Sequence, residues 1–246
     1  MSIALRIDDI GASSKQYEVY SKKLYGLGNL LFLKYMPAFM AWGPYREMTP
    51  VEWDSVFEIL DEYNAKLTVS VTACWVEYNG SLINFDKKYP EESRKLKQGM
   101  KSGLLEIANH GLTHCVTEQM KFRPRFFMSN RKYHREFWDW LPDKTHFEHI
   151  ELSQKILQDY FETDITTFVP PGNVYSEVTE HACLKYGIKT INCNTVSRKE
   201  MGINIIGNDQ IIDFHDREMV IEGTEWLKRR LEELPDDSEY IFVKEL

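Results

Sequence analysis

The chain alternates short β-branched runs with amphipathic helical stretches. We expect strands at Ser2–Ile7, Lys66–Thr72, Leu104–Ala108, Ile165–Val169, Ile188–Asn192, Ile211–Phe214 and Tyr240–Val243. We expect helices from Thr49, at Pro90–Gly99, at Phe147–Phe161, at Ser176–Gly187 and after Glu222. Strands that alternate with helices favour a parallel sheet covered by helices, either open or closed into a barrel.

The clearest helix start is at Thr49. Thr49 is a suitable N-cap, Pro50 suits the first helical position, and Glu52 completes a capping box. The apolar residues that follow have helical spacing: Trp53, Val56, Phe57 and Leu60. One face of this helix is therefore expected to pack on the sheet.

Composition places the chain among ordinary globular proteins and excludes several classes. Of 246 residues, 43% are hydrophobic and 28% are charged, and 6 Trp, 13 Tyr and 13 Phe argue against disorder. A net charge of −8 argues against a general nucleic-acid binder. No run of about 18 apolar residues is present, so no transmembrane helix is expected. No linker interrupts the chain, and we expect one domain over residues 1–246.

The first residues and the cysteines indicate the compartment. The start MSIALRIDD has no basic region, long apolar region or cleavage site of a signal peptide, so we expect a cytoplasmic protein. Its cysteines fall in no CxxC spacing, and we expect reduced thiols in or near the core rather than a zinc site. They are Cys74, Cys115, Cys183 and Cys193.

Polar groups that could carry chemistry follow the predicted strands. In parallel α/β folds the carboxyl ends of the strands converge on one face, which carries the active site. The groups at these ends are Asp8-Asp9, His110 with His114, the turn at residues 170–173, and His215-Asp216.

Each of these groups has a structural interpretation and a functional one. Asp8 and Asp9 are either an exposed turn before Gly11, or a metal ligand next to a general base. The spacing of His110 and His114 places two imidazoles on one face of a helical turn. With Asp9 they form a two-histidine, one-carboxylate set that suits Zn²⁺ or an Fe²⁺-like ion and leaves positions open for water and substrate.

His215 ends a predicted strand, where a lone histidine is often structural. As a third histidine at the same edge it is a candidate general acid. Asp213 lies two residues earlier, on the same strand face.

Four motifs resemble those of the polysaccharide deacetylase family (the NodB-homology, carbohydrate esterase 4 type). RIDDIG is similar to TFDDG, NHGLTH to H-(S/T)-x-x-H, FVPPG to R-x-P-Y-G, and IIDFHD to the final strand-His motif, in the same order. Gly111 stands where the second motif has Ser or Thr. The resemblance implies an α/β fold, a distorted (β/α)7-type barrel, and metal-dependent removal of N- or O-acetyl groups from sugars.

The resemblance also implies roles for individual residues. Asp9, His110 and His114 would hold one divalent metal ion, with Zn as first choice and Fe, Co, Ni or Mn as alternatives. Asp8 would be the catalytic base. His215 would be the catalytic acid, and Asp213 could hold its imidazolium.

Two departures from the motifs concern the groups around the metal. Phe168 replaces the arginine that pairs with the base, and we hypothesise that Arg6, on the same strand face as Asp8, replaces it. Pro171 stands where a tyrosine donates its backbone N–H to the oxyanion, and proline has no N–H. Another donor, such as the Gly172 N–H, would then be needed.

Other segments suit the substrate pocket or the core. We place Pro171, Gly172, Asn173 and Trp75 in the pocket. Residues 120–140 mix basic and aromatic side chains, typical of either an amphipathic helix or an anion-gripping, sugar-stacking subsite. Residues 29–45 are too short to span a bilayer and suit the core, a lid or an interface.

The expected function is a metal-dependent deacetylase acting on an acetylated saccharide. A nucleotide- or lipid-linked precursor of a surface polysaccharide is one candidate substrate. One alternative is a barrel hydrolase of another non-peptide C–N bond, in a small amide or imide. Another is a catalytically inactive barrel that binds glycans or partners. The sequence leaves the sugar and the oligomeric state open.

Overall fold

One curled sheet organises the fold, in strand order β10-β1-β2-β5-β6-β7-β9-β8. The computed structural model describes residues 2–17, 46–77, 79–116, 135–200, 202–235 and 237–246. The sheet's strands are β1 (Ser2–Ile10), β2 (Leu67–Val71), β5 (Leu105–Asn109), β6 (Thr167–Phe168), β7 (Thr190–Asn192), β8 (Arg198–Glu200), β9 (Ile203–Ile206), β10 (Ile211–His215) and β11 (Glu239–Ile241). A separate hairpin consists of β3 (Cys74–Val76) and β4 (Leu82–Asn84).

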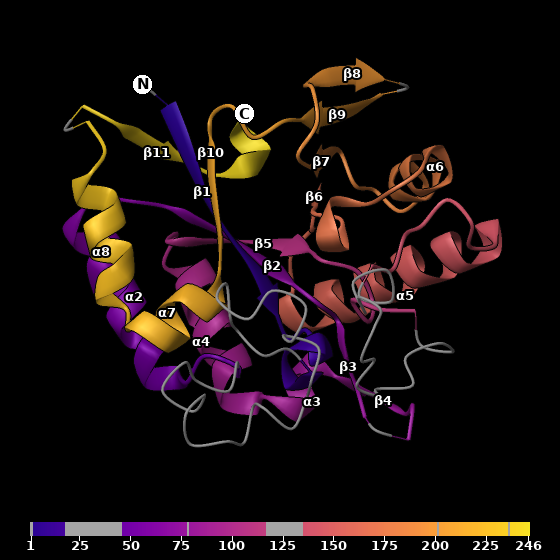
Figure 1. The fold of residues 1–246 in the computed structure, drawn as a ribbon, viewed down its shortest axis with the longest axis horizontal. Helices are drawn as coiled ribbons and strands as arrows, with labels where there is room; N and C mark the ends of the chain where they lie inside the picture. Colours follow the sequence, from indigo (N-terminus) through magenta and orange to yellow (C-terminus); the bar gives the residue numbers. More distant parts are fainter. Residues whose placement is uncertain (1, 18–45, 78, 117–134, 201, 236) are drawn as a thin grey trace, which may run out of the picture.

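The sheet is parallel except at one end, where β8 runs antiparallel to β9. β11 pairs in parallel with the beginning of β1. Among the described strands β8 and β10 end the hydrogen-bonded order, so the sheet is a curled half-barrel (Figure 1). The predicted α/β barrel-type architecture is confirmed, with the barrel left open.

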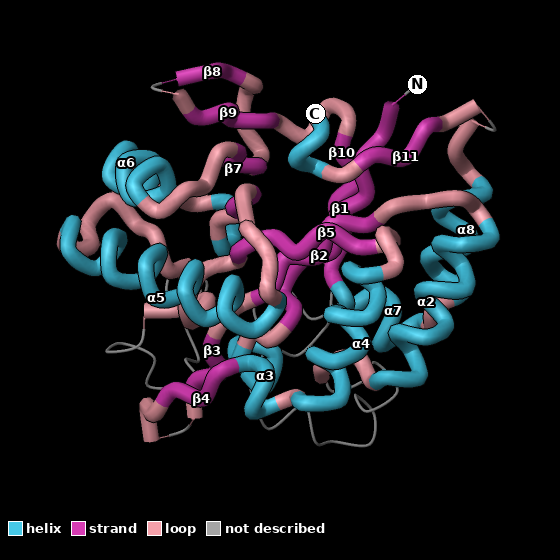
Figure 2. Tube along the Cα trace, turned by 180° about the vertical axis from the view of Figure 1, so that it is seen from behind, coloured by secondary structure: helices cyan, strands magenta, loops and turns pink. Residues whose placement is uncertain are grey.

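Helices cover the sheet in two groups (Figure 2). The described α-helices are α2 (Pro50–Glu62), α3 (Phe85–Lys88), α4 (Pro90–Lys101), α5 (Asp143–Phe161), α6 (Glu177–Lys185), α7 (Asp216–Glu222) and α8 (Glu225–Glu232). α2, α4 and α8 pack with β1, β2 and β5 around the larger apolar core, and α5 and α6 pack with β6, β7 and β9 around a second one. None of the described helices is long and apolar enough to cross a bilayer.

The predicted start of α2 is confirmed. The Glu52 backbone N–H donates to the Thr49 hydroxyl (3.3 Å), and the Thr49 N–H donates to the Glu52 carboxylate (2.7 Å), which is a capping box. Trp53, Val56 and Leu60 are fully buried, as their helical spacing indicated. Local sequence therefore sets both where α2 begins and which face it buries.

A buried polar layer crosses the sheet below the strand ends. The register places Arg6 level with Thr68, and Thr68 level with Glu106. The buried Glu106 carboxylate accepts from the hydroxyls of Thr68 (2.8 Å) and Thr167 (2.5 Å) and from the Lys244 backbone N–H (3.3 Å). These bonds link β2, β6 and the C-terminal turn to one carboxylate of β5.

Three expectations remain, one about the cysteines and two about chain segments. All four cysteines are buried and unpaired, as expected. The segment at residues 29–45 lies outside the described residues, and the basic-aromatic segment is described only from residue 135 onward.

Candidate metal centre and active site

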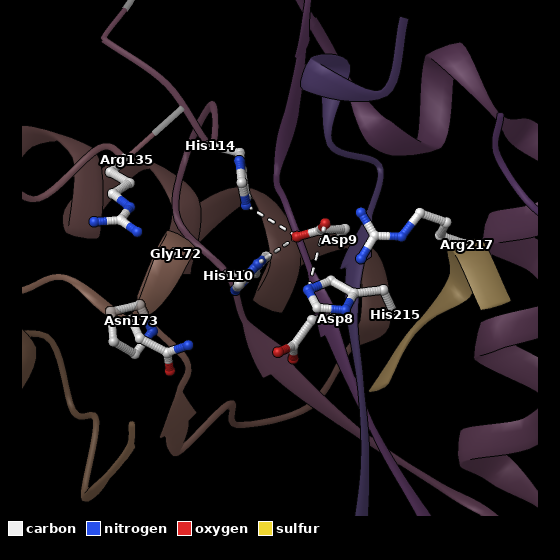
Figure 3. A pocket seen from close by; sticks show the side chains of 10 residues that line it. Asp8, Asp9, His110, His114, Arg135, Gly172, Asn173, His215 and Arg217 are labelled. Atoms are coloured by element: carbon white, nitrogen blue, oxygen red, sulfur yellow. Dashed lines mark hydrogen bonds and ion pairs between the residues drawn. The ribbon is translucent and has the colours of Figure 1, made fainter. Parts of the chain in front are cut away.

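A bulge at the end of β1 directs the side chains of two consecutive aspartates toward the same pocket. β1 pairs with β2 in register up to Ile7, and the register shifts before Ile10. Asp9 has φ 70°, in the left-handed region. In a regular strand Asp8 and Asp9 would point to opposite faces. Because of the bulge, both line the same pocket (Figure 3).

The two predicted histidines face Asp9 from the loop after β5. His110 Nδ1 lies 2.6 Å from the Val169 carbonyl oxygen, so Nδ1 carries the hydrogen and donates it. In neutral His110 this leaves Nε2 as the lone-pair nitrogen, 3.3 Å from Asp9 Oδ1. His114 Nε2 lies 3.0 Å from the same oxygen. Strand-end positions more than 100 residues apart thus converge on one carboxylate.

Asp9, His110 and His114 fit a divalent ion. Each offers one ligand atom, and the three atoms lie within 4.8 Å of one another. All three residues are buried, and all three line the pocket. Two imidazole nitrogens and one carboxylate oxygen suit Zn²⁺ or a similar transition ion. The Val169 carbonyl orients His110 in the way that outer-shell acceptors orient histidine ligands.

A buried glutamate, which the sequence analysis did not identify, anchors the loop that carries His114. The Glu136 carboxylate accepts backbone N–H bonds from Leu112 (3.0 Å), Thr113 (3.1 Å) and His114 (2.9 Å). His149 Nδ1, from α5, lies 2.5 Å from Glu136 Oε1, the oxygen that also accepts the Leu112 N–H. Glu136 therefore fixes the backbone of His114, which has φ 57°.

Gly111 is required by the same carboxylate. Its φ is +82°, and a Cβ there would lie 2.3 Å from Glu136 Oε2. Glycine tolerates this backbone conformation and leaves room for the glutamate. The Gly111 departure from the resembled motif therefore has a physical cause in this chain.

Arg6 pairs with Asp8, as hypothesised from their spacing. Arg6 Nε donates to Asp8 Oδ1 (2.9 Å) and an Arg6 terminal nitrogen donates to Asp8 Oδ2 (2.8 Å). The fully buried guanidinium also bonds Asn192 Oδ1 and lies 3.3 Å from Asp213 Oδ2. A bidentate guanidinium both orients the Asp8 carboxylate and favours its charged form.

His215 lies beside Asp8 across the β1–β10 register. Its Nε2 is 3.9 Å from Asp9 Oδ2, and its Nδ1 is 4.0 Å from a Glu218 oxygen. Asp213, which was expected to hold the His215 imidazolium, contacts another residue in this structure. The register places Asp213 level with Arg6, so these two residues pair instead.

The electrostatics favour two carboxylates and a basic histidine. Burial acts to raise the pKa of Asp8, but the charges of Arg6, His110 and His215 outweigh it and hold that pKa below its ordinary value. Burial is likewise outweighed at Asp9, where His114 and His215 hold the pKa well below its ordinary value. Burial acts to lower the pKa of His215, but the negative charges of Asp9 and Asp8 outweigh it and raise that pKa above its ordinary value.

The wall opposite β1 comes from the turn after β6. Pro170, Gly172 and Asn173 line the pocket, and binding of substrate by Gly172 and Asn173 stays a prediction. Pro171 is buried, and its neighbour Pro170 is the proline that lines the pocket as described. The Asn173 side chain is fixed by the Asn194 backbone N–H, which donates to its Oδ1 (3.2 Å).

Trp75, which was also expected in the pocket, lies elsewhere among the described residues. It packs edge-on against Tyr89, with ring centroids 5.4 Å apart, and Lys88 covers its ring. β3 belongs to the separate hairpin rather than to the main sheet. Two arginines line the pocket instead: Arg135, from the basic-aromatic segment at residues 120–140, and Arg217, which the sequence analysis did not name.

A sequence profile described as polysaccharide deacetylase matches residues 43–191. The match covers more than half of the chain and includes His110 and His114. It includes neither the Asp8-Asp9 pair nor His215. The assignment of those three residues to the site rests on their positions around the same pocket. No curated protein sequence matches the chain.

Several solved structures share the fold at low sequence identity. A candidate polysaccharide deacetylase from Mycobacterium smegmatis matches with a TM-score of 0.56 and 10% identity, over 99% of this chain and 87% of that one. A family 4 acetyl xylan esterase from Clostridium thermocellum, in complex with a cobalt ion, matches with a TM-score of 0.51 and 14% identity, over 100% and 89%.

A third similar structure is a CE4 family pseudoenzyme from Bacillus anthracis, with a TM-score of 0.51 and 13% identity. The match covers 81% of this chain and 61% of that one, so this chain spans less than two thirds of the pseudoenzyme's length. A mutant of that pseudoenzyme with restored enzymatic activity matches equally well. The shared fold therefore occurs in both active and inactive proteins.

Proposed function

Because this chain belongs to the polysaccharide deacetylase family, we propose that it is a metal-dependent hydrolase that removes an acetyl group from a saccharide. One observation carries the proposal. Asp9, His110 and His114 present their ligand atoms within 4.8 Å, while Asp8 and His215 line the same pocket. A base, an acid and a cation site in one pocket are what hydrolysis of an acetamide requires.

The proposed metal ligands are Asp9 Oδ1 and the Nε2 atoms of His110 and His114. A divalent ion held there, with zinc as first choice, would polarise the acetyl carbonyl and acidify a water molecule. Asp9 lies between the two imidazoles, and the low pKa of its carboxyl keeps it anionic. The roles of the protein groups follow from their places around these ligands.

Asp8 is the proposed base and His215 the proposed acid. The Asp8 carboxylate takes a proton from water as the water oxygen bonds to the acetyl carbon. His215, as imidazolium, then gives its proton to the leaving nitrogen while the C–N bond breaks. The products are acetate and the free amine. Arg6 keeps Asp8 charged and oriented, and the raised pKa of His215 suits a proton donor.

The oxyanion that forms during attack needs a further donor. Neither Pro170 nor Pro171 has a backbone N–H. Gly172, the next residue of the turn, lines the pocket and has one. We assign the Gly172 N–H as the candidate donor that assists the metal.

As the substrate we propose a nucleotide- or lipid-linked precursor of a surface polysaccharide. Acetate release from a panel of acetylated sugars, both free and carrier-linked, tests it. Release from one carrier-linked acetamido sugar supports the precursor. Release only from oligosaccharides overturns the precursor and leaves the deacetylase.

A catalytically inactive, glycan-binding barrel is the second candidate function. The structural likeness to a CE4 pseudoenzyme favours it, as does the replacement of the third-motif arginine by Phe168. The bidentate Arg6–Asp8 pair argues against it, because it supplies the arginine partner from another strand position. Glycan binding without acetate release, in protein that holds its metal, would favour the inactive barrel.

A further inference from the structure

A buried ion cluster lies next to the candidate site and has no role in the proposed chemistry. Lys15 belongs to a short 3₁₀ helix, η1 (Ser13–Tyr17), and its side chain is 1% exposed. Its ammonium group pairs with the Glu47 carboxylate (2.7 Å) and with the Asp216 carboxylate, and both carboxylates are buried. We call Lys15, Glu47 and Asp216 the ion cluster. The described lining of the pocket includes none of the three.

The ion cluster holds its parts through charged hydrogen bonds. Burial acts to lower the pKa of Lys15, but the charges of Asp216 and Glu47 outweigh it and raise that pKa above its ordinary value. Buried ion pairs often stabilise a fold no more than apolar side chains of the same volume would. Their hydrogen bonds are directional, however, so they fix the segments that they join. The identity of those segments therefore indicates what the ion cluster does.

One of the joined segments is the turn that follows Asp9. The Ala12 backbone N–H donates to the Asp9 carbonyl oxygen (3.0 Å), and the Lys15 backbone N–H donates to the Ala12 carbonyl oxygen (3.3 Å). Glu47 Oε2, which pairs with Lys15, also accepts the Gly11 backbone N–H (2.9 Å). Lys15 and Glu47 are thus connected through a short hydrogen-bonded turn to a candidate metal ligand.

The other joined segment is the beginning of α7, which carries the candidate acid. His215 caps α7 in a capping box with Glu218, whose Oε2 accepts the His215 backbone N–H (3.0 Å). The imidazole itself is 37% exposed, and oxygens of Asp9 and Glu218 lie 3.9 and 4.0 Å from its nitrogens. Its position is therefore set mainly by the backbone at the beginning of α7. Asp216, the first residue of α7, is fully buried and pairs with Lys15.

We propose that Lys15 is a positioning residue for His215, through its bond with Asp216. The pairing of β10 with β1 ends at His215, so the register of the sheet does not extend to Asp216. Lys15 and Asp216 are 201 residues apart in sequence, and their bond joins the turn after Asp9 to the beginning of α7. This sets where the acid meets the leaving group, and catalysis is sensitive to such placement. The inference rests on the proposed function for the role of His215, but the position of the imidazole can be measured without turnover.

Two acetyl esters test whether the ion cluster serves the acid. The phenolate that leaves 4-nitrophenyl acetate is stable without a proton, whereas the more basic phenolate of phenyl acetate gains from a proton donor. In the zinc-loaded protein, Asp216→Ala and Lys15→Met should lower kcat for phenyl acetate about tenfold or more, and kcat for 4-nitrophenyl acetate about twofold or less. An equal loss for both esters, or no loss for either, would make the ion cluster structural only and overturn the inference.

The variants and their control keep this test independent of folding. Lys15→Met leaves two buried carboxylates without their lysine, whereas Asp216→Ala leaves the pair of Lys15 with Glu47. Asp216→Asn, which keeps the size of the side chain, replaces either variant if it does not fold. Asp54→Ala is the matched control, because Asp54 of α2 also pairs with a lysine, Lys95 of α4 (2.5 Å). It should leave both kcat values unchanged.

Nitrogen NMR of the histidine rings measures the position of the imidazole without turnover. The signals of His215 are those that are missing from His215→Gln. In Asp216→Ala they should broaden or split into several sets, because the imidazole is no longer held in one position. The signals of His146, which Thr179 of α6 contacts (2.9 Å), should stay unchanged. One sharp set of His215 signals in the variant would overturn the inference.

The two measurements separate this inference from the proposed function. Natural protein that hydrolyses neither ester, together with broadened His215 signals in Asp216→Ala, would leave the positioning role and count against the deacetylase. Ester hydrolysis that falls equally for both esters would overturn the positioning role and leave the deacetylase. A loss confined to phenyl acetate, with broadened His215 signals, supports both.

Discussion

The Arg6 guanidinium holds the Asp8 carboxylate through two side-by-side hydrogen bonds, of 2.9 and 2.8 Å. Both side chains are buried, so removing one leaves the other as an unpaired charge. We expect Arg6→Met to lower the free energy of unfolding by about 3–5 kcal/mol. We also expect kcat to fall, because the Asp8 carboxylate loses its orientation. Urea unfolding and acetate-release kinetics measure the two effects.

Asp213 provides the matched control for this pair. Asp213→Asn removes only the 3.3 Å contact with Arg6 at a partly exposed position. It should cost about 1 kcal/mol or less and leave kcat nearly unchanged. Arg6→Met with unchanged kcat would show that Asp8 needs no arginine partner.

Glu136 is expected to control metal affinity without touching the metal. Glu136→Gln turns one acceptor oxygen into an N–H₂ group that faces backbone N–H donors. The loop that carries His114 should loosen, and zinc affinity should fall about 10–100-fold. Competition with a chromophoric chelator measures the affinity. Unchanged zinc affinity, in a variant whose free energy of unfolding has fallen, would make Glu136 a structural residue only.

Gly111 should tolerate no side chain, for a steric reason as well as a backbone one. Gly103 has nearly the same φ, +81° against +82°, but nothing lies within 4 Å of a Cβ built there. Gly103→Ala therefore reports the cost of the backbone conformation alone. Gly111→Ala adds the contact with Glu136, so it should destabilise the protein more and also weaken zinc binding.

The same clash predicts non-additive double variants. Truncation by Glu136→Ala removes the carboxylate that a Gly111 Cβ would meet. The zinc affinity of the double variant should therefore equal that of Glu136→Ala alone. Fully additive losses would mean that Gly111 and Glu136 act on the metal site separately.

Glu106 predicts a pH dependence of stability. Burial raises the pKa of Glu106 above its ordinary value, although bonds from Thr167 and Thr68 oppose the shift. The folded protein thus binds this proton more tightly than the unfolded chain, and stability falls as pH rises above the unfolded value of about 4.5. Relative to Glu106→Gln, the natural protein should lose stability from pH 4 toward neutral pH. Urea unfolding of both proteins across this range checks the sign, and a natural protein that gains stability relative to Glu106→Gln as the pH rises would contradict it.

The positions of the proposed catalytic and metal-binding residues could be predicted because each follows a strand. Asp8, Asp9, His110 and His215 all lie at the carboxyl ends of strands in one parallel sheet, and such ends converge. The Arg6–Asp8 pair followed from the two-residue period of a strand. Both inferences use local sequence and a general property of parallel sheets.

The errors come from register and topology, which local sequence does not encode. Asp213 shares a strand face with His215, but only the β1–β10 register shows that it lies level with Arg6. Trp75 belongs to a strand that leaves the main sheet for a hairpin. The hairpin, α7 and the β8–β9 pair were not predicted because such short elements carry little periodicity.

Glu136 was not predicted because its partners are distant in sequence. It lies 22 residues after His114 and 13 before His149, and only the folded chain joins the three. The signal in the sequence was Gly111, whose replacement of a polar residue in the second motif indicates a side chain packed against it. An unexpected glycine beside a ligand is thus a useful pointer to an unseen partner.

The metal content of the purified protein after reconstitution with zinc tests the central claim most directly. We predict about one equivalent per chain in the natural protein and in Asp8→Asn, and much less in Asp9→Asn. Natural protein that holds no zinc, or an Asp9→Asn variant that holds as much as the natural protein, would contradict the proposed metal centre.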